Sequence, residues 1–371
     1  MVINMGEPLL RVENLNIRIR KAGRSLTAVE DVSFSLRPGG TLGIVGESGC
    51  GKSVTCLSIL RLAPPNIEIS GGKVYFEGRL LNRLSEREFD ALRGRAFSMI
   101  FQDSISGLNP LMKIGRQVAE AVPAPGRVRE GEPGGPVGRG GGLIGGGRMA
   151  RRERRETVLR LLRQVRLENA EQVAERYPHE LSGGQRQRVM IAIAIAAGPG
   201  LLIADEPTTA LDVTTQREIL SLLREIQTRT GMGMILISHD VGVIRRMCDD
   251  VLVMYSGQAV EAGSARDVLE DPRHPYTAGL VRSAVAAGIR GGALYAIEGT
   301  VASLEQRRHL TGCVFAERCE KRCERAAEPP GPYLLEGGAR MCRCFLAHAP
   351  RRGGGGGGHG GGGDDYEHVN R

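Results

Sequence analysis

An eight-residue stretch near position 50 has the residue types that bind phosphate groups. It follows the apolar segment 41–45 and consists of Gly46, Glu47, Ser48, Gly49, Cys50, Gly51, Lys52 and Ser53. The pattern G-x-x-x-x-G-K-S lets backbone amides surround phosphate oxygens, because glycine permits a close approach of the chain. We expect Lys52 to reach the terminal phosphates and the Ser53 hydroxyl to bind Mg²⁺. Val54 continues the first helical turn, whose free amides favour an anion.

Two carboxylates end a second apolar segment, LLIADE at 201–206. Asp205 is suited to hold Mg²⁺, and Glu206 is placed to polarise a water molecule as a general base. His239 ends another apolar segment, 233–240, and is expected to touch the terminal phosphate; Gln102 is expected to contact the same Mg²⁺ or the attacking water. A surface acidic pair, a structural histidine and an ordinary loop glutamine are the alternatives.

The segment LSGGQRQR, at 181–188, carries a glycine pair that local structure does not require. Ser182 and Gln185 fit a capping box at the start of a helix. Gly183 and Gly184 open the backbone in addition, so that their amides and the Ser182 hydroxyl can approach an anion. The sequence therefore predicts a second phosphate-binding element on a chain that already has a complete one.

Five of the eight cysteines lie near the C-terminal end of the chain. A reducing cytosol keeps thiols free, so the cluster favours a metal over disulfides. Four thiolates for a [4Fe–4S] cluster or Zn²⁺ would come from Cys313, Cys319, Cys323 and Cys342, with Cys344 as an alternative fourth ligand. The lack of paired C-x2-C spacing favours the iron–sulfur cluster. Reduced thiols in a small core are the remaining alternative.

Buried strands that alternate with helices must position these residues. Apolar segments at 41–46, 201–206 and 233–240 predict strands of a largely parallel α/β sheet, and 251–263 predicts a β-hairpin. Ligands bind at the carboxyl ends of such strands. The stretch from about 105 to 197 is mostly helical, with a glycine- and arginine-rich insert at 123–150 that cannot form a core.

Composition and charge narrow the function classes. The net charge is +8, but residues 127–160 hold nine Arg and four Glu, which is +5 of that total. The excess is therefore local, and we expect no nucleic-acid partner. No secretory signal and no membrane span are predicted, so we expect a cytoplasmic protein that meets a membrane only through a partner. The tail at 351–371 is expected to be disordered.

The motifs occur in the order and spacing of an ATP-binding-cassette (ABC) ATPase, which the chain resembles. The resemblance rests on 46–53, Gln102, 181–185, 201–206, Ala210-Leu211-Asp212 and His239. It implies a P-loop NTPase (RecA-like) core with an antiparallel β subdomain and an α-helical signature subdomain. In that family the LSGGQ segment binds the γ-phosphate of ATP held by the opposite subunit of a head-to-tail pair, and Asp212 resembles the loop that crosses the interface.

Longer segments, among them YPHELSGGQRQRVMIAIAIA and DPRHPYTAGLV, resemble the ATPase subunits of oligopeptide, dipeptide and nickel importers. This implies an ATPase that powers uptake through two permease subunits, with a second, related ATPase subunit, an extracytoplasmic solute-binding protein and a place on the cytoplasmic face of the cell membrane. It also implies domains at 8–263 and 264–350, the second small and cysteine-containing. The alternative is a non-transport ABC assembly such as a carbon–phosphorus lyase complex.

Two positions depart from the family pattern. Ile19 stands where the family stacks adenine on an aromatic ring, so only apolar contact with the base is expected. Cys50 stands in the phosphate loop where a small or small polar residue is usual. We expect thiol reagents to inhibit the ATPase unless ATP protects Cys50.

Overall fold

The computed structural model describes residues 7–102, 107–123, 151–288, 295–335 and 338–348. The tail at 351–371 and all but the first residue of the insert at 123–150 lie outside these ranges. Within the described ranges, no helix is long and apolar enough to cross a membrane.

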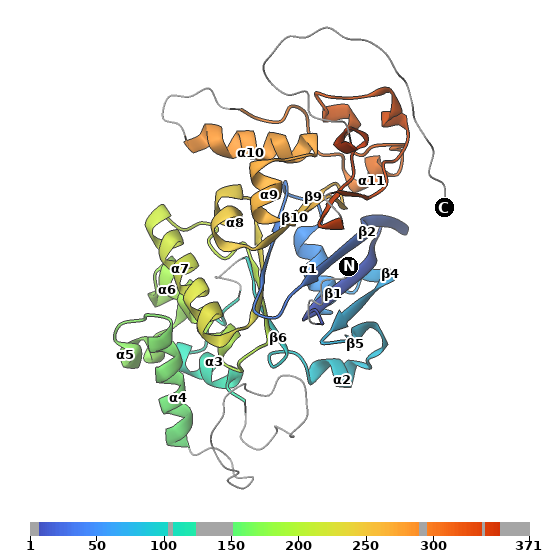
Figure 1. The fold of residues 1–371 in the computed structure, drawn as a ribbon. Coiled ribbons are helices and arrows are strands. Elements are labelled where there is room, and N and C mark those ends of the chain that lie inside the picture. Colours follow the sequence, from blue (N-terminus) through green and yellow to red (C-terminus); the bar gives the residue numbers. More distant parts are fainter. Residues whose placement is uncertain (1–6, 103–106, 124–150, 289–294, 336–337, 349–371) are drawn as a thin grey trace.

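A mixed sheet of eight strands forms the centre of the molecule (Figure 1). Its five parallel strands are, in spatial order, β9 (Asp250–Tyr255), β3 (Thr41–Val45), β8 (Gly233–Ser238), β7 (Leu201–Asp205) and β6 (Phe97–Ile100). Every residue of β3, β7 and β8 is buried, as expected for strands covered on both faces. The three predicted strands and the hairpin are confirmed, the latter with a turn at Ser256 and Gly257 that has two positive φ angles.

The sheet continues beyond β9 through three antiparallel strands. They are β10 (Gln258–Ser264), β12 (Arg340–Cys342) and β11 (Tyr333–Leu335). The cysteine-rich C-terminal part of the chain is thus joined to the central sheet by strand pairing.

A second, antiparallel sheet covers one face of the first. Its strands, in the order β2-β1-β4-β5, are β1 (Leu10–Lys21), β2 (Arg24–Leu36), β4 (Ile67–Phe76) and β5 (Arg79–Leu80). One apolar core fills the space between the sheets and takes in α1 (Lys52–Ile59). This is the predicted antiparallel subdomain.

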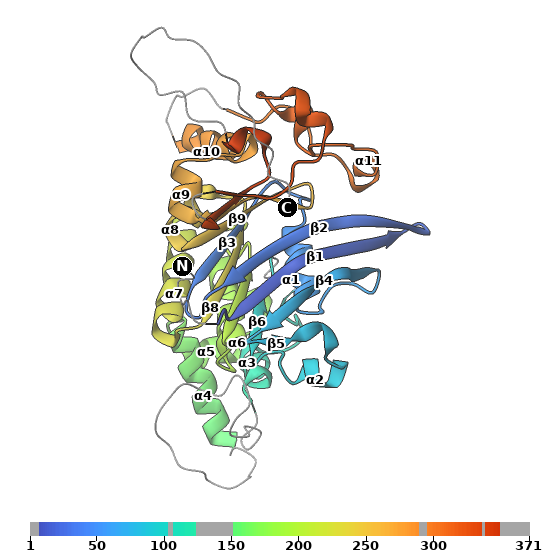
Figure 2. The same cartoon turned by 45° about the vertical axis from the view of Figure 1, so that its right-hand side comes forward.

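Helices cover the other face and extend below it (Figures 1 and 2). A second apolar core joins them to the sheet. The helical subdomain contains α3 (Ile114–Ala121), α4 (Arg151–Gln164), α5 (Ala170–Glu175), the 3₁₀ turn η2 (Pro178–Glu180) and α6 (Gly183–Ile195), and the sheet is covered by α7 (Val213–Thr230), α8 (Val241–Met247) and α9 (Ala265–Glu270). Helix α4 buries Val158, Leu161 and Leu162, and Val165, one residue beyond its end, is buried as well.

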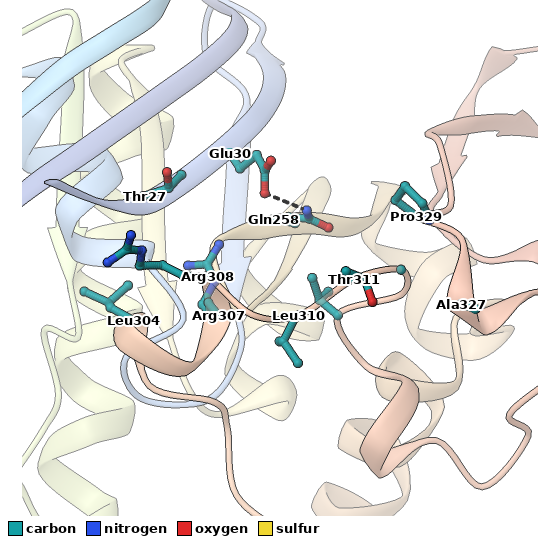
Figure 3. Close-up of a pocket in the computed structure, with 12 residues that line it drawn as sticks. Thr27, Glu30, Gln258, Leu304, Arg307, Arg308, Leu310, Thr311, Ala327 and Pro329 are labelled. Carbon is teal, nitrogen blue, oxygen red and sulfur yellow. Dashed lines mark hydrogen bonds between the residues drawn. The ribbon is translucent and has the colours of Figure 1, made fainter.

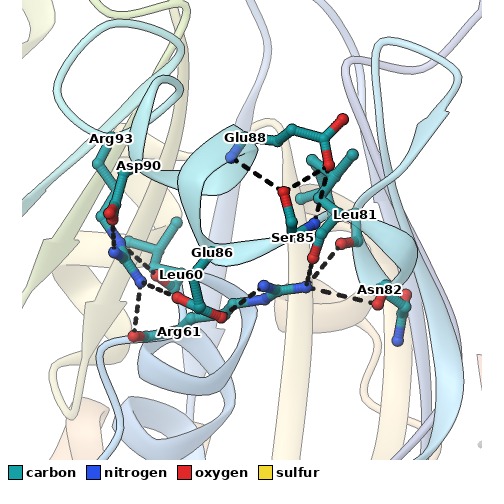
Figure 4. A network of polar contacts seen from close by, with 10 residues as sticks. Leu60, Arg61, Leu81, Asn82, Ser85, Glu86, Glu88, Asp90 and Arg93 are labelled. Atoms are coloured by element: carbon teal, nitrogen blue, oxygen red, sulfur yellow. Dashed lines mark hydrogen bonds and ion pairs between the residues drawn. The ribbon is translucent and has the colours of Figure 1, made fainter.

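Two arginines fix the C-terminal end of α1 to the short elements η1 (Leu81–Arg83) and α2 (Glu86–Asp90) (Figure 4). Arg61 donates to Glu86 and to the carbonyl oxygens of Leu81 and Leu84, and its guanidinium lies over the Phe89 ring. Arg93 pairs with Asp90 on the other side. The helix that carries Lys52 and Ser53 is therefore anchored at its C-terminal end.

The C-terminal segment folds over the top of the central sheet. It contains α10 (Pro275–Gly288), α11 (Leu304–Arg307), η3 (Ala316–Arg318), η4 (Glu324–Ala327) and η6 (Phe345–His348). α11 lies along β2, where Arg307 donates to the carbonyl oxygen of Ala28, and its Glu305 pairs with Lys21 at the end of β1. A cavity of about 450 Å³ lies beside this contact, lined by Thr27, Glu30, Gln258 and residues of 304–312 (Figure 3).

Candidate nucleotide site

The glycine-rich loop joins β3 to α1 at the carboxyl end of the parallel strands. Gly46 has φ 157, and a Cβ there would lie 2.2 Å from the carbonyl oxygen of Met254, so only glycine fits. Gly51, in the left-handed region with φ 106, is the N-cap of α1. Ser48 and Gly49 are exposed at the tip of the loop, and Val54 is half-buried in the first turn of the helix. This is the predicted strand, loop and helix.

Lys52 is folded into the loop and is 5% exposed. Its Nζ donates to the carbonyl oxygens of Gly46, at 2.7 Å, and Glu47, at 3.0 Å. The ammonium therefore lies inside the ring of backbone that is expected to hold phosphate. It is held there by neutral acceptors, which a phosphate anion would replace with a stronger charge-assisted bond.

Ser53 and Asp205, which are 152 residues apart in the sequence, are brought together in the fold. The Ser53 hydroxyl donates to Asp205 Oδ1 at 3.0 Å. Asp205 ends β7 and is buried, and this burial raises the pKa of its carboxyl, against the opposing effect of the Ser53 hydrogen bond. A hydroxyl and a buried carboxylate in contact form a donor set that suits Mg²⁺.

Three polar groups converge on one oxygen of Glu206. Its Oε2 accepts from Gln102 Nε2 at 3.2 Å and from the Thr209 hydroxyl at 2.9 Å, and lies 3.3 Å from His239 Nδ1. Glu206 has φ 44, a left-handed conformation that is rare for a residue with a side chain. The structure thus brings together Gln102, Glu206 and His239, and the strain marks Glu206 as a position that the surrounding structure holds in place.

Thr209 was not predicted from the sequence. It lies three residues after Glu206 in a turn, and its amide donates to the Glu206 carbonyl oxygen. Threonine often occurs in turns, so nothing in the sequence distinguishes Thr209 from an ordinary turn residue.

The residues LSGGQ, at 181–185, are called the signature segment here. They lead into α6 with the capping box that their pattern predicts. The Ser182 hydroxyl accepts from the Gln185 amide, and the Gln185 side chain accepts from the Ser182 amide. A Cβ on Gly184 would lie 2.7 Å from Thr215 Cγ2, so this glycine lets α6 approach α7. Asp212 is the N-cap of α7 and accepts from the amides of Thr214 and Thr215, which lowers the pKa of its carboxyl.

No hydrogen bond among the described residues joins the segment 182–185 or Asp212 to the phosphate loop of the same chain. The segment is exposed to half-buried at Ser182, Gly183, Gly184 and Gln185. The segment 182–185 is therefore accessible to another molecule.

The two residues that depart from the family pattern, Ile19 and Cys50, have different surroundings in the structure. Ile19 lies near the end of β1, is half-buried, and pairs with Leu26 and Ile67. Cys50 is fully buried, and its burial raises the pKa of the thiol. The thiolate is the reactive form of cysteine, so the structure argues against the expected attack by thiol reagents.

The C-terminal cysteines are gathered differently from the predicted set. Cys313, Cys319 and Cys323 line one small cavity together with Cys344. Cys342 is not among them, because it lies in β12 opposite Glu261 of β10, where its thiol is buried within the sheet. The predicted alternative, Cys344, thus lies with Cys313, Cys319 and Cys323, whereas Cys342 lies apart from them. Within the described ranges, no three His, Cys, Asp or Glu side chains are arranged to hold a metal ion.

Comparison with known proteins gives two family matches. Residues 29–209 match the ABC transporter family, and residues 260–325 match the oligopeptide/dipeptide transporter C-terminal region. The second match covers the start of the segment that folds over the central sheet.

Curated relatives match along nearly the whole chain. The dipeptide transport ATP-binding protein DppD of Bacillus subtilis is 41% identical over 92% of this chain and 95% of its own length. The oligopeptide transport ATP-binding protein OppD of Salmonella typhimurium is 41% identical over 91% of this chain and 93% of its own length.

A solved structure shares the fold over most of the chain. The post-hydrolysis dimer of the ATP-binding cassette MJ0796, bound to ADP and Pi, matches with a TM-score of 0.56 and 26% identity, over 69% of this chain and 99% of that one. With the phosphate loop, the carboxylates and the signature segment in place, these matches establish that the chain belongs to the ABC transporter ATPases, in the oligopeptide/dipeptide import family.

Proposed function

We propose that the chain hydrolyses ATP at the site formed by the phosphate loop, Asp205 and Glu206, and that this hydrolysis powers peptide uptake. The observation that carries the proposal is the convergence of Gln102, Thr209 and His239 on Glu206, next to the Ser53–Asp205 contact. A general base needs this kind of support, because its carboxylate must point at one water molecule.

Each residue has a separate role in the proposed reaction. Amides of the loop 46–54 bind the phosphates, apart from the Glu47 amide, which donates to the Tyr276 hydroxyl, and Lys52 leaves the Gly46 and Glu47 carbonyls to pair with them. Ser53 and Asp205, with Gln102 nearby, are the residues that would hold Mg²⁺, which supplies charge neutralisation at the phosphates. Glu206 accepts a proton from the attacking water, and His239 orients Glu206 and the terminal phosphate. Ile19 offers apolar contact to the base.

A second ATPase subunit completes the site in this proposal. Support comes from the exposed signature segment and from the MJ0796 structures, which are dimers. Ser182, Gly183, Gly184 and Gln185 would face ATP held by the partner, and Asp212 would lie at the interface. Two chains arranged head to tail then close over two ATP molecules and open after hydrolysis.

The cargo and the setting follow from the family. The relatives' names refer to peptide, dipeptide and oligopeptide transport, and the match at 260–325 favours transport over a carbon–phosphorus lyase assembly. We propose that two permease subunits hold the chain at the cytoplasmic face of the membrane and that a solute-binding protein delivers the peptide.

The proposed base is tested by Glu206→Gln in the assembled importer. The amide keeps the size of the carboxylate, so ATP binding should persist while the hydrolysis rate falls by about 10²- to 10⁴-fold. Glu270→Gln, at an exposed ion pair on α9, is the matched control and should leave the rate unchanged. Hydrolysis within threefold of the wild-type rate in Glu206→Gln would show that another group acts as the base.

We further propose that Cys313, Cys319, Cys323 and Cys344, rather than Cys342, form the thiol set for a [4Fe–4S] cluster or Zn²⁺. Support comes from the cavity that these four side chains share; their thiols would have to move closer together on binding, because within the described ranges no three of them are arranged around a metal position. Iron, zinc and acid-labile sulfide would be measured after anaerobic purification of the full chain. Cys344→Ser should lose the metal, whereas Cys342→Ser should keep it. Equal metal content in both variants would contradict this ligand set.

A further inference from the structure

The phosphate loop is held from outside the cassette by a tyrosine of the C-terminal segment. The Tyr276 hydroxyl accepts a hydrogen bond from the Glu47 amide at 2.8 Å. Tyr276 is the second residue of α10 and is fully buried. Burial raises the pKa of its hydroxyl, so it stays neutral and keeps its place as an acceptor.

An arginine of the same segment holds the side chain of Glu47. Arg318 Nη1 lies 2.8 Å from Glu47 Oε2, and the Arg318 side chain is 7% exposed. Its Nε donates to the Glu298 carbonyl oxygen at 2.8 Å and its Nη2 to that of Ile297 at 3.2 Å. The guanidinium therefore has a fixed direction before it meets Glu47.

Aromatic packing fixes both side chains relative to the sheet. The Tyr276 ring lies 4.7 Å from the Tyr255 ring and 5.4 Å from the Phe315 ring, measured between centroids. Arg318 lies over Tyr255 and touches its hydroxyl at 3.4 Å. Tyr255 ends β9, the strand next to β3, which leads into the loop. The contact is thus part of the core and not a surface encounter.

The peptide group between Gly46 and Glu47 is hydrogen-bonded on two sides. Lys52 binds the Gly46 carbonyl oxygen from within the loop, while Tyr276 binds the Glu47 amide from outside. When Lys52 turns to a phosphate, the outer contacts remain. They are then the groups that keep this end of the loop in shape.

Glu47 also places a negative charge in a loop that must bind an anion. Like charges in one site repel each other, and the cost is larger where water is excluded. Arg318 neutralises Glu47 through a partly buried, charge-assisted contact, in which the Glu47 side chain is 27% exposed. Without Arg318, the carboxylate would oppose the phosphates of the nucleotide.

We propose that Tyr276 and Arg318 are positioning residues of the nucleotide site: Tyr276 holds the Glu47 amide, and Arg318 cancels the Glu47 charge. The C-terminal segment is then part of the nucleotide site, and nucleotide affinity depends on it. The inference rests on the proposed role of the loop 46–53 in binding ATP.

The test is calorimetric titration of the full chain with MgADP. Arg318→Gln should weaken binding about tenfold, since one unit charge near phosphates is left unpaired. The double variant Arg318→Gln/Glu47→Gln should bind within about threefold of Glu47→Gln alone, because the opposing charge is gone. Arg282→Gln removes a similar, exposed ion pair with Glu320 and should leave the affinity unchanged.

A kinetic readout separates positioning from catalysis. In the assembled importer, Arg318→Gln should raise the KM for ATP about tenfold and leave kcat within about twofold, because Glu206, Gln102 and His239 are untouched. Tyr276→Phe keeps the ring and removes only the hydroxyl, so it should raise KM by about threefold. Tyr276→Phe tests the inference if Arg318→Gln does not fold.

The outcomes distinguish a failure of this inference from a failure of the proposed function on which it rests. Unchanged affinity in Arg318→Gln or, if that variant does not fold, in Tyr276→Phe would overturn the inference. So would a double variant as weak as Arg318→Gln alone, since the arginine would then act only through the fold. A wild-type chain that binds no MgADP would instead overturn the proposed function of the loop.

Discussion

Arg340 and Glu261 form a buried ion pair whose disruption should loosen the C-terminal segment. The two side chains are 2% and 0% exposed, and Arg340 Nε lies 3.1 Å from Glu261 Oε1. Arg340 also donates to the Asp271 carbonyl oxygen. The pair joins β12 to β10, so Arg340→Met removes the charge partner of a carboxylate that water does not reach.

The loss of stability depends on the hydrogen bonds that Glu261 keeps in the variant. Breaking a buried pair by removing one partner costs about 3–5 kcal/mol. Glu261 still accepts from the amides of Arg273, at 2.9 Å, and His274, at 3.1 Å, so we expect the lower end, about 3 kcal/mol. That free energy corresponds to about a 150-fold change in the equilibrium for local opening.

Hydrogen exchange followed by mass spectrometry measures this opening region by region. In Arg340→Met, amides of β10, β12 and the first turn of α10 should exchange about 150-fold faster, while those of α7 should keep the wild-type rate. Arg266→Met is the control, because Arg266 makes an exposed ion pair with Glu270 worth less than about 1 kcal/mol.

Two results would refute this reasoning. Exchange within threefold of wild type in β10 and β12 would show that the pair contributes little. Uniformly faster exchange over the whole chain would show that the variant unfolds globally. The double variant Arg340→Met/Glu261→Gln should recover most of the protection, since removing both charges leaves no buried ion.

Three further predictions concern single side chains. Burial lowers the pKa of His274 to about 4, against 6.5 in an unfolded chain; the unfolded state therefore takes up the proton first, and stability should fall by about 3 kcal/mol as the pH drops from 6.5 to 4. A thermal unfolding series should show that His274→Asn flattens this dependence. Cys50 should resist iodoacetamide at pH 8 by peptide mass mapping, with the ATPase rate retained; full labelling would contradict its burial. Ile19→Tyr should tighten MgADP binding by about two- to tenfold through stacking, whereas Ile19→Leu should not, as calorimetry would show.

Much of the fold and the nucleotide site could be predicted because short apolar segments end in polar residues. Fully apolar runs such as 201–204 predict strands buried on both faces, and the residues that follow must then lie at one edge of a parallel sheet. That geometry alone brings Asp205 close to Ser53, and Glu206 close to His239. The roles proposed for Ser182 and Gln185 follow less directly, because both also cap their helix.

The C-terminal cysteines show where spacing alone is insufficient. Cys342 and Cys344 are two residues apart, and their order in the sequence does not say which one faces the other thiols. Strand β12 decides the matter, because it ends at Cys342 and pairs this residue with Glu261. Cys344 lies beyond the strand, and its thiol reaches the cavity lined by Cys313. Pairing between distant strands cannot be deduced from one short segment.

The segment HPYT, at 274–277, connects the C-terminal strands to the phosphate loop. Glu261 accepts the His274 amide, His274 Nδ1 accepts the Tyr276 amide, and the Tyr276 hydroxyl accepts the Glu47 amide. These contacts form one path from the buried ion pair in β10 to the phosphate loop. Because every donor on this path is a backbone amide, a shift of the C-terminal strands moves the loop itself. Loosening β12 should therefore weaken nucleotide binding even though Arg340 touches no residue of the loop.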